Sequence, residues 1–398
     1  MFLDRLIKRN HGLPMAAARL HQSGAVRANT YLIDLDTLAE NARHIKQAAD
    51  DHGLSLYFMS KQFGRNPDAC RTLLAAGVPA AVAVDLWDMA ALRRSRTPIG
   101  NVGHLVQPHR GGEDEVLAVR PEVVTLFSMD AAERIGAAAG RAGRTQDILL
   151  RVTAPGDHFY FGHGGGFPLA SIEEAARAVS RVGGLKVAGV TTFPCLLANP
   201  ATRTVEPTHN FQTLAEAARR LRAAGFDIWQ VNAPGTTSAC TMAALRRGGA
   251  THVEPGNGFH GTAPQHAFDP DSPELPAIVY VSEVSHLDGN DAYVFAAGYY
   301  VDKVLGNYEL TALCGRDGNI LERRYRVDTA GPDAIHYYCI MRLEPNHDVR
   351  PGDTVVFCFR PQTFVTRART QALTGVWSNR PVPLRVYDQE AQPVEGAA

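Results

Sequence analysis

The chain has 398 residues, of which 45% are hydrophobic and 20% are charged, and its formal net charge at pH 7 is −1. These values are typical of a globular protein with about two domains, and they exclude a basic nucleic-acid-binding face or a polybasic membrane-binding segment. We find no run of about 18 apolar residues that would span a membrane, and the charged start does not resemble a signal peptide. The six cysteines are widely spaced, so we expect free thiols, no metal site and a reducing cytoplasm.

A helical segment is expected over residues 1–29, and short apolar runs then alternate with helical patterns over residues 30–267. Alternating strands and helices pair in parallel with right-handed crossovers, and about eight repeats favour a closed (β/α)₈ barrel over an open sheet. Nine runs fit strands, so the first, "TYLIDL" at 30–35, is expected to lie partly outside the barrel. The others are "SLYFMS", "AAVAVD", "VGHLVQ", "EVVTLFS", "DILLRVT", "KVAGVTTF", "IWQVNA" and "HVEPG".

The pattern changes at "FDPDSPELP", residues 268–276, which has the composition of a linker. After it come β-type runs such as "AIVYVSEVSHL" and "DTVVFCF", separated by turns such as "RPGD". Residues 268–398 are therefore predicted to form an all-β domain, either a small barrel or a sandwich.

Lys61 directly follows an apolar strand in "LYFMSKQFGRNP". The chain has only five lysines against thirty-five arginines, and Lys61 is the one that closes such a strand. A lysine at a strand end usually packs its stem and leaves its ammonium in water. The alternative is a reactive amine that forms a Schiff base, because chemistry in a barrel is found at the C-terminal ends of strands.

Two glycine-containing turns follow the last two predicted strands of the barrel, "NAPGTTSAC" at 232–240 and "EPGNGFHG" at 254–261. Backbone N–H groups and hydroxyls at such a place suit a phosphate, although an ordinary Thr/Ser helix cap has the same sequence. Glu254 could keep a pyridine nitrogen protonated, or it could be a cap or a surface charge. Together with Lys61, these features suggest pyridoxal 5′-phosphate (PLP). The residues expected to contact it are Lys61, Gly235, Thr236, Thr237, Ser238, Glu254, Gly256, Asn257 and Gly258.

The order of "TYLIDLDTLAENAR", "YFMSKQFGRNP", "NAPGTTS", "EPGNGFHG" and "AAGYY" resembles the alanine racemase-like, fold-type III PLP enzymes, and within them the YhfX-type group. "TFPCLLAN" and "FRPQTFVTR" add to the resemblance, which covers nearly the whole chain. It implies that Lys61 holds PLP and that the protein is a head-to-tail homodimer. It also implies a second acid–base group in "AGYY", with Tyr299 as first choice and Tyr300 as second. Either tyrosine could instead be an aromatic residue of a core.

The sequence departs from the alanine racemases at two places. Glu254 stands where they have an arginine, which resembles the decarboxylase branch. Thr192 stands where many relatives have a histidine near the ring, and the nearby His158 and His163 are either substitutes or plain loop residues. In "FRPQTFVTR", Arg367 or Arg360 could hold a substrate carboxylate, or be a solvated strand arginine.

These observations predict an amino acid racemase that acts at Cα through Lys61 and Tyr299. The alternative is a decarboxylase or other lyase, for which Cys314 and Asp317 of "ALCGRD" match the expected cysteine-and-aspartate motif poorly. A non-catalytic PLP carrier is disfavoured by the β domain. A metal-dependent aldolase is disfavoured because no compact His/Cys pair occurs there.

Overall fold

The structure is a computed structural model that describes residues 1–301, 305, 309–316, 319–331 and 335–394. It divides the chain into two compact units. The barrel unit consists of Arg43–Ser60 and Leu74–Gly258. The β unit consists of Met1–Ala42, Lys61–Leu73 and Phe259–Ala398.

The barrel unit contains a closed ring of parallel strands. Each strand pairs in parallel with the next in the ring, and the last pairs with β2, so the sheet has no open edge. This ring confirms the predicted (β/α)₈ barrel. In order around it, the strands are β2 (Ser55–Met59), β3 (Ala80–Ala83), β4 (Ile99–Val102), β5 (Val123–Leu126), β6 (Gln146–Thr153), β8 (Leu185–Thr191), β11 (Gln230–Asn232) and β12 (His252–Val253).

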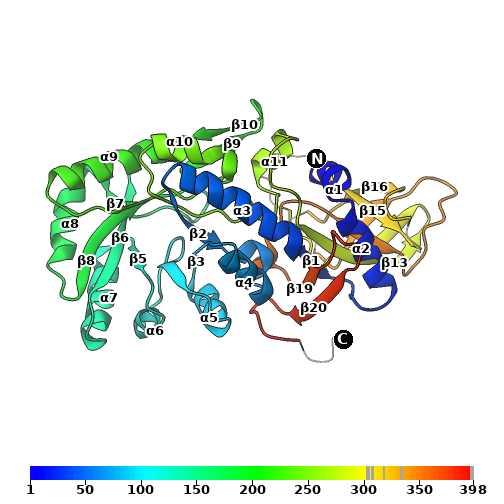
Figure 1. The fold of residues 1–398 in the computed structure, drawn as a ribbon, viewed down its shortest axis with the longest axis horizontal. Coiled ribbons are helices and arrows are strands. Elements are labelled where there is room, and N and C mark those ends of the chain that lie inside the picture. The colour runs from blue at the N-terminus through cyan, green and yellow to red at the C-terminus, as the bar shows by residue number, and fades with distance from the viewer. Residues whose placement is uncertain (302–304, 306–308, 317–318, 332–334, 395–398) are drawn as a thin grey trace. The chain divides into compact units, whose positions relative to one another are not determined.

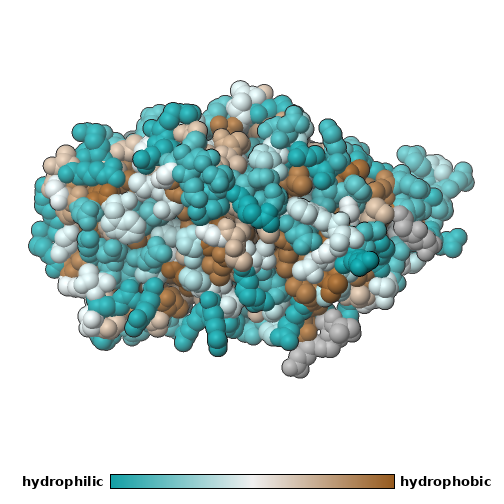
Figure 2. All heavy atoms as spheres, in the orientation of Figure 1, coloured by the Kyte–Doolittle hydropathy of each residue, from teal (hydrophilic) through white to brown (hydrophobic). Residues whose placement is uncertain are grey.

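Helices follow most of the barrel strands (Figure 1). Several begin at residues whose side chains cap the first turn: Asp85 accepts a hydrogen bond from the Asp88 N–H, and Ser128 from the Ala131 N–H. On the face shown in Figure 2, hydrophilic residues predominate on the outside of these helices. The helices that follow barrel strands are α4 (Pro67–Ala75), α5 (Leu86–Arg94), α6 (Glu113–Ala118), α7 (Met129–Arg141), α8 (Ile172–Ser180), α9 (His209–Ala223) and α10 (Met242–Arg247), and α3 (Leu35–Asp51) precedes β2.

The run "VGHLVQ" is not a strand, contrary to the prediction. The strand there is β4, which ends at Val102, and Gly103 then takes a left-handed conformation with φ of +82°. Gln107 holds the following loop by donating to the carbonyls of Gly103 and Thr125 at 3.0 and 2.8 Å. Three strands outside the ring were not predicted: β7 (Phe167–Pro168), which pairs with β6, and the hairpin of β9 (Leu196–Asn199) and β10 (Thr204–Pro207).

The β unit is built on an antiparallel sheet that closes on itself. The pairings run β14, β17, β16, β15, β18 and β13, and β13 pairs back with β14, so a small barrel is the form adopted. These strands are β13 (Ile278–Asp288), β14 (Asp291–Phe295), β15 (Thr311–Gly315), β16 (Arg324–Asp328), β17 (Tyr338–Arg342) and β18 (Thr354–Phe357).

Strand β1 (Thr30–Asp34), the first predicted barrel strand, belongs to the sheet of the β unit. It pairs antiparallel with β13 and parallel with β19 (Arg369–Thr374), which in turn pairs with β20 (Val382–Tyr387). All five of its residues are buried, as expected for a central strand covered on both faces. The first of the nine apolar runs therefore lies outside the barrel.

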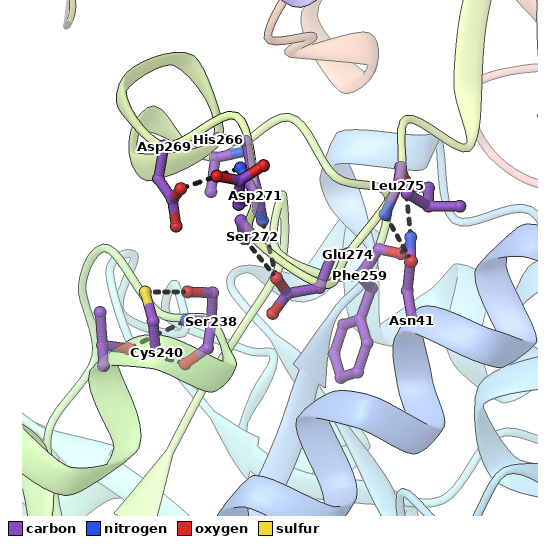
Figure 3. A network of polar contacts seen from close by, with 12 residues as sticks. Asn41, Ser238, Cys240, Phe259, His266, Asp269, Asp271, Ser272, Glu274 and Leu275 are labelled. Carbon is purple, nitrogen blue, oxygen red and sulfur yellow. Dashed lines mark hydrogen bonds and ion pairs between the residues drawn. The ribbon is translucent and has the colours of Figure 1, made fainter. Parts of the chain in front are cut away.

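The N-terminal helices α1 (Phe2–Arg9) and α2 (Gly12–Gln22) are also part of the β unit. Arg5 of α1 donates hydrogen bonds of 2.5–3.2 Å to the carbonyls of His266, Asp269, Ser272 and Glu274. Ser272 and His266 in turn contact the buried Glu274 carboxylate at 2.8 and 3.1 Å (Figure 3). The linker-like segment is thus held firmly to α1, and it follows the short helix α11 (Pro264–Phe268).

Candidate active site

Lys61 lies two residues beyond the end of β2, at the start of a short 3₁₀ turn, η1 (Lys61–Phe63). Its side chain is half-buried, and its Nζ lies 5.1 Å from the centroid of the Phe364 ring, within the range of a cation–π interaction. The turn is fixed to the β unit because the Thr363 hydroxyl donates to the Gln62 carbonyl at 2.6 Å. The amine is therefore presented by a rigid turn, with its apolar stem shielded.

Glu254 directly follows β12, and its side chain is completely buried. One carboxylate oxygen, Oε1, accepts from Asn101 Nδ2 at 3.0 Å and from Asn232 Nδ2 at 2.8 Å. Asn101 belongs to β4 and Asn232 to β11, which lie on opposite sides of the ring. A group that bonds to both must lie in the lumen of the barrel. Glu254 is therefore an interior carboxylate and not a surface charge.

The two asparagines are themselves oriented by threonines of neighbouring strands. The Thr125 hydroxyl donates to Asn101 Oδ1 at 2.9 Å, which turns the amide nitrogen of Asn101 toward Glu254. Asn232 Nδ2 also donates to the Thr191 hydroxyl at 3.3 Å, and this hydroxyl in turn donates to the Asn232 backbone carbonyl at 3.1 Å. Two amide donors on one oxygen favour the ionised form of a carboxylate. This part of the barrel is thus arranged to keep a negative charge in its interior.

The two glycine-containing turns lie against each other, as a shared phosphate site would require. A Cβ on Gly258 would come within 2.5 Å of the Thr237 carbonyl oxygen, and one on Gly235 within 2.8 Å of the Leu196 nitrogen. Only glycine allows both approaches. Thr237, Gly256 and Asn257 are also buried.

The expected free backbone N–H groups of this turn are in part already used. The Thr236 N–H donates to the Leu196 carbonyl at 3.2 Å, and the Ser238 N–H to the Thr241 hydroxyl at 3.0 Å. The Ser238 hydroxyl lies 3.2 Å from the Cys240 sulfur (Figure 3). The helix that follows is short, because a three-residue 3₁₀ turn precedes the six residues of α10. Ser238 is thus a helix cap in this state, and the Thr237 hydroxyl, which donates a longer bond of 3.3 Å to the Gly235 carbonyl, is the better placed candidate for a phosphate.

Arg151 of β6 is the largest fully buried side chain, with 1% of its surface exposed. Its guanidinium lies 4.6 Å from the centroid of the Phe127 ring and donates to the His163 carbonyl. Its Nε has no hydrogen-bond partner among the described residues, and burial lowers its pKa to about 10. A buried cation with an unused donor is costly unless an anion binds beside it.

Thr192 follows β8 and is buried, and its hydroxyl has no hydrogen-bond partner in the described part of the chain. His158 and His163, the possible substitutes for the missing histidine, lie in the loop after β6. Both pack against the Tyr160 ring, with centroids 5.8 and 5.9 Å apart, and His163 also contacts Phe193 at 5.9 Å. The loop is thus a cluster of aromatic and imidazole rings.

Tyr299 is buried in the aromatic core of the β unit. Its ring centroid lies 5.6 Å from that of Phe357 and 5.2 Å from that of Phe359. Tyr300, the next residue, is exposed. In the isolated chain, Tyr299 therefore has the packing of a core aromatic, and Tyr300 is the tyrosine that reaches solvent.

The two arginines of "FRPQTFVTR" differ in exposure. Arg367 is exposed, donates to the His336 carbonyl at 3.3 Å and lies 5.8 Å from the Tyr337 ring centroid. Arg360 is partly buried. Arg367 thus has the environment of a solvated arginine, and it lies in a bend two residues before β19 rather than in a strand.

The alternative functions depend on residues that are only partly described. Cys314 is buried, and burial raises the pKa of its thiol to about 12, whereas Asp317 lies outside the described residues. Within the described residues, no group of three or more His, Cys, Asp or Glu side chains could hold a metal ion. Among the residues that the structure describes, no helix is long and apolar enough to cross a membrane.

Sequence reasoning missed four polar residues of the barrel interior: Asn101, His104, Arg151 and Asn232. His104 is 1% exposed, and its Nδ1 lies 3.4 Å from Glu254 Oε2. The available signal was a single polar residue within or just after an apolar strand, as in "IGNVGH" and "DILLRVT". Such a residue is costly to bury without a purpose.

Comparison with known proteins places the chain in a family. Residues 33–264 match the family model of the alanine racemase N-terminal domain, and residues 279–382 match that of the YhfX-like C-terminal domain. The chain belongs to the alanine racemase-like, fold-type III family. It is 35% identical over 388 residues to the uncharacterized protein YhfX of Escherichia coli strain K12, covering 98% of each chain. Members of this family use PLP.

Solved structures with a similar fold include enzymes of different activities. D-threonine aldolase from Filomicrobium marinum matches with a TM-score of 0.68 and 15% identity, over 92% of this chain and 96% of that one. D-threo-3-hydroxyaspartate dehydratase from Delftia sp. HT23 matches with a TM-score of 0.67 and 17% identity, over 90% of this chain and 97% of that one. Alanine racemase of Clostridium difficile 630 matches with a TM-score of 0.63 and 14% identity, over 90% of this chain and 98% of that one. At these identities the likeness is one of fold alone.

Proposed function

We propose that this chain is a PLP-dependent amino acid racemase that acts at Cα with Lys61 and Tyr299 as its two bases. The observation that carries the proposal is the placement of Lys61, a half-buried amine on a rigid turn directly after a barrel strand. Membership of a PLP-using family supports the same cofactor here. We also propose a cytoplasmic location, which the six free cysteine thiols support.

The polar groups of the barrel unit fit this cofactor. PLP carries a ring nitrogen, a phenolic oxygen and a phosphate, which a carboxylate, hydrogen-bond donors and a turn with close backbone approach can hold. Glu254 supplies the first, and the Arg151 Nε and Thr192 hydroxyl are buried donors without a hydrogen-bond partner among the described residues. Gly235 and Gly258 permit the close approach. When bound, PLP would take up the electron pair left at Cα after proton removal.

We assign the following roles to the residues of the chain. Lys61 holds the cofactor and exchanges a proton with one face of Cα, and Tyr299 does so on the other face. Thr236, Thr237, Ser238, Gly256, Asn257 and Gly258 hold the phosphate, with Thr237 as the main hydroxyl donor. Glu254 keeps the ring nitrogen protonated. Arg367 and Tyr300 contribute to substrate binding, and Tyr300 replaces Tyr299 if the register differs by one residue.

A head-to-tail homodimer is part of the proposal, because the family resemblance puts the tyrosine of one chain at the site of the other. The exposed Tyr300 beside the buried Tyr299 supports a surface at this point of the β unit that a second copy could cover. No nucleic acid or membrane partner is proposed, and the small-molecule partner is an amino acid.

A decarboxylase or other lyase is the second candidate, and the environment of Glu254 favours it. A carboxylate held in its ionised form by two amides would keep the ring a strong electron sink, which serves the loss of CO₂ or of a side-chain group as well as proton transfer. Against a decarboxylase of the cysteine-dependent type stands Cys314, whose raised pKa leaves an inert thiol at neutral pH.

Incubation of the purified protein with a panel of L- and D-amino acids in D₂O distinguishes these functions. A racemase inverts configuration and introduces deuterium at Cα. A decarboxylase releases CO₂, and other lyases release a carbonyl compound or ammonia. Loss of CO₂ or of a side-chain fragment without inversion would replace the racemase proposal by the lyase one.

The two-base assignment has its own test. Tyr299→Phe keeps the ring packing and removes only the hydroxyl, so racemisation should collapse while exchange of the Cα proton continues for one enantiomer. Mixing inactive Lys61→Ala with inactive Tyr299→Phe should restore part of the activity, because a mixed dimer has one intact site. If Tyr300→Phe is the inactive variant instead, Tyr300 and not Tyr299 is the second base, and the two-base mechanism stands. Full activity of both phenylalanine variants would refute the two-base mechanism.

A further inference from the structure

His104 faces Glu254 within the lumen of the barrel, on the carboxylate oxygen opposite the one to which the two asparagines donate. Its Nδ1 lies 3.4 Å from Oε2, whereas Asn101 and Asn232 both donate to Oε1. The imidazole is 1% exposed and packs edge-on against the Phe193 ring, with centroids 5.7 Å apart at 82°. His104 therefore has little access to water, and its charge is governed by its immediate neighbours.

A buried carboxylate needs a positive partner. Removing a charge from water costs several kcal/mol even after relaxation, and two amide donors compensate this cost only in part. Two further titratable groups act on Glu254 electrostatically, Tyr57 and Cys195, and burial raises the pKa of each, so both are neutral at pH 7. His104, at ion-pair distance, is a basic group placed to balance Glu254.

We propose that His104 is a positioning residue that carries the positive charge opposite Glu254 in the cofactor-free protein and yields this charge when a protonated ring nitrogen takes its place. The second half of this inference rests on the proposed function, and the first half does not. Two cations beside one buried carboxylate repel each other, so cofactor binding should leave His104 neutral.

The proton balance depends on whether the ring nitrogen of PLP is already protonated when PLP binds. If it arrives unprotonated, the proton of His104 passes by way of Glu254 to the ring nitrogen, and the number of bound protons is unchanged. If it arrives protonated, one proton leaves His104 for the solvent. In both cases Glu254 stays ionised and the ring stays protonated.

Nitrogen NMR of protein labelled with ¹⁵N-histidine tests the inference directly. The His104 signals are assigned through the His104→Gln variant, and the cofactor is removed before the first measurement. At pH 7 the His104 ring should be doubly protonated in the cofactor-free protein and neutral after addition of PLP. In Glu254→Gln it should be neutral without PLP, because the charge that stabilises the imidazolium is gone.

His252 provides a matched control at the start of β12, two residues before Glu254. It is buried, its Nδ1 lies 2.9 Å from the Thr251 hydroxyl, and burial lowers its pKa to about 4. Its ring should be neutral at pH 7 in every sample, so a change at both histidines would indicate general rearrangement. A pH titration of the wild-type protein that compares these two histidines needs no variant and covers the case in which a variant does not fold.

The affinity for PLP gives a second measurement. Below the pH at which free PLP takes up its ring proton, wild-type binding releases one proton, so affinity should fall by up to about tenfold per pH unit of acidification. The His104→Gln variant should lose this pH dependence of PLP affinity.

A neutral His104 in the cofactor-free protein at pH 7, or a His104 whose protonation is unaffected by Glu254→Gln, would overturn the charge pair. A His104 that stays charged with PLP bound would overturn the exchange of charge. If PLP does not bind at all, the proposed function and this exchange fall together, and the cofactor-free spectra still decide on the pair.

Discussion

Substituting Glu254 by glutamine should separate catalysis from stability in this barrel. Glutamine has the same shape, and its amide oxygen can accept the bonds from Asn101 and Asn232 that now reach Oε1 at 3.0 and 2.8 Å. Its amide nitrogen would then occupy the place of Oε2, 3.4 Å from His104 Nδ1. The fold should therefore tolerate the change. Because it removes a buried charge, we expect the free energy of unfolding to stay within about 1 kcal/mol of the wild-type value.

The rate should respond more strongly than the stability. A charge-assisted hydrogen bond contributes about 1.5–3 kcal/mol, and its loss at the ring nitrogen would weaken the electron sink by a similar amount. At about 1.4 kcal/mol per factor of ten, steps that build negative charge on Cα should slow about ten- to a hundredfold. The assay is exchange of the Cα proton in D₂O, with the bound cofactor measured in the same sample.

Glu122→Gln is a suitable control, because it makes the same chemical change in the same unit. Glu122 accepts a hydrogen bond from the Tyr57 hydroxyl at 2.6 Å and lies just before β5, at the opposite end of a strand from the candidate site. The Glu122→Gln variant should exchange the Cα proton at the wild-type rate. If the Glu254→Gln variant with bound cofactor exchanges the Cα proton at the wild-type rate, Glu254 does not contact the pyridine ring of PLP.

Three further outcomes are expected. Borohydride reduction should attach PLP permanently to the peptide that contains Lys61, and mass spectrometry that finds the label on another lysine would refute its role. Thr237→Ala should weaken PLP binding about tenfold with turnover at saturating cofactor little changed, since the phosphate is remote from Cα; unchanged affinity would make the turn a helix cap only. Burial lowers the pKa of His252 to about 4 and that of His260 to about 3. The free energy of unfolding should therefore fall as the pH drops from 6.5 to about 4, because both histidines take up a proton in the unfolded chain but stay neutral in the folded one. The effect is at most about 1.4 kcal/mol per pH unit for each histidine, and urea unfolding of His252→Gln should show a shallower pH dependence.

The barrel could be predicted from the sequence because each strand and helix carries its own local signal. Alternating apolar runs and helical patterns recur along the chain, and parallel pairing follows from them. β1 shows the limit of this reasoning. A fully buried strand of a parallel barrel and a central strand of an antiparallel sheet have the same apolar composition, so "TYLID" alone could not reveal that its partners are β13 and β19.

The interior of the barrel was harder to predict than its outline. Lys61 and Glu254 were found because each ends an apolar run, where a charged residue is conspicuous. Asn101 and Asn232 are separated by most of the barrel sequence, and they meet at Glu254 only because the sheet closes into a ring. His104 was assigned to a strand, since the end of β4 depends on the left-handed turn at Gly103, which a hydrophobic pattern does not reveal.

The choice between racemase and lyase chemistry depends on groups other than Glu254. A buried carboxylate held by two amides would support any reaction that leaves an electron pair on Cα, so it cannot select among them. Selection needs a proton donor on the face opposite Lys61. The buried Tyr299, packed against Phe357 and Phe359, is rigidly oriented but would have to present its hydroxyl from that core, whereas the exposed Tyr300 is accessible and less constrained. A racemase needs one of these hydroxyl groups to exchange a proton with Cα at every turnover, by donating it in one direction and removing it in the other, whereas a lyase can proceed without this exchange. The phenylalanine variants of the two tyrosines therefore decide the reaction class more directly than any change around Glu254.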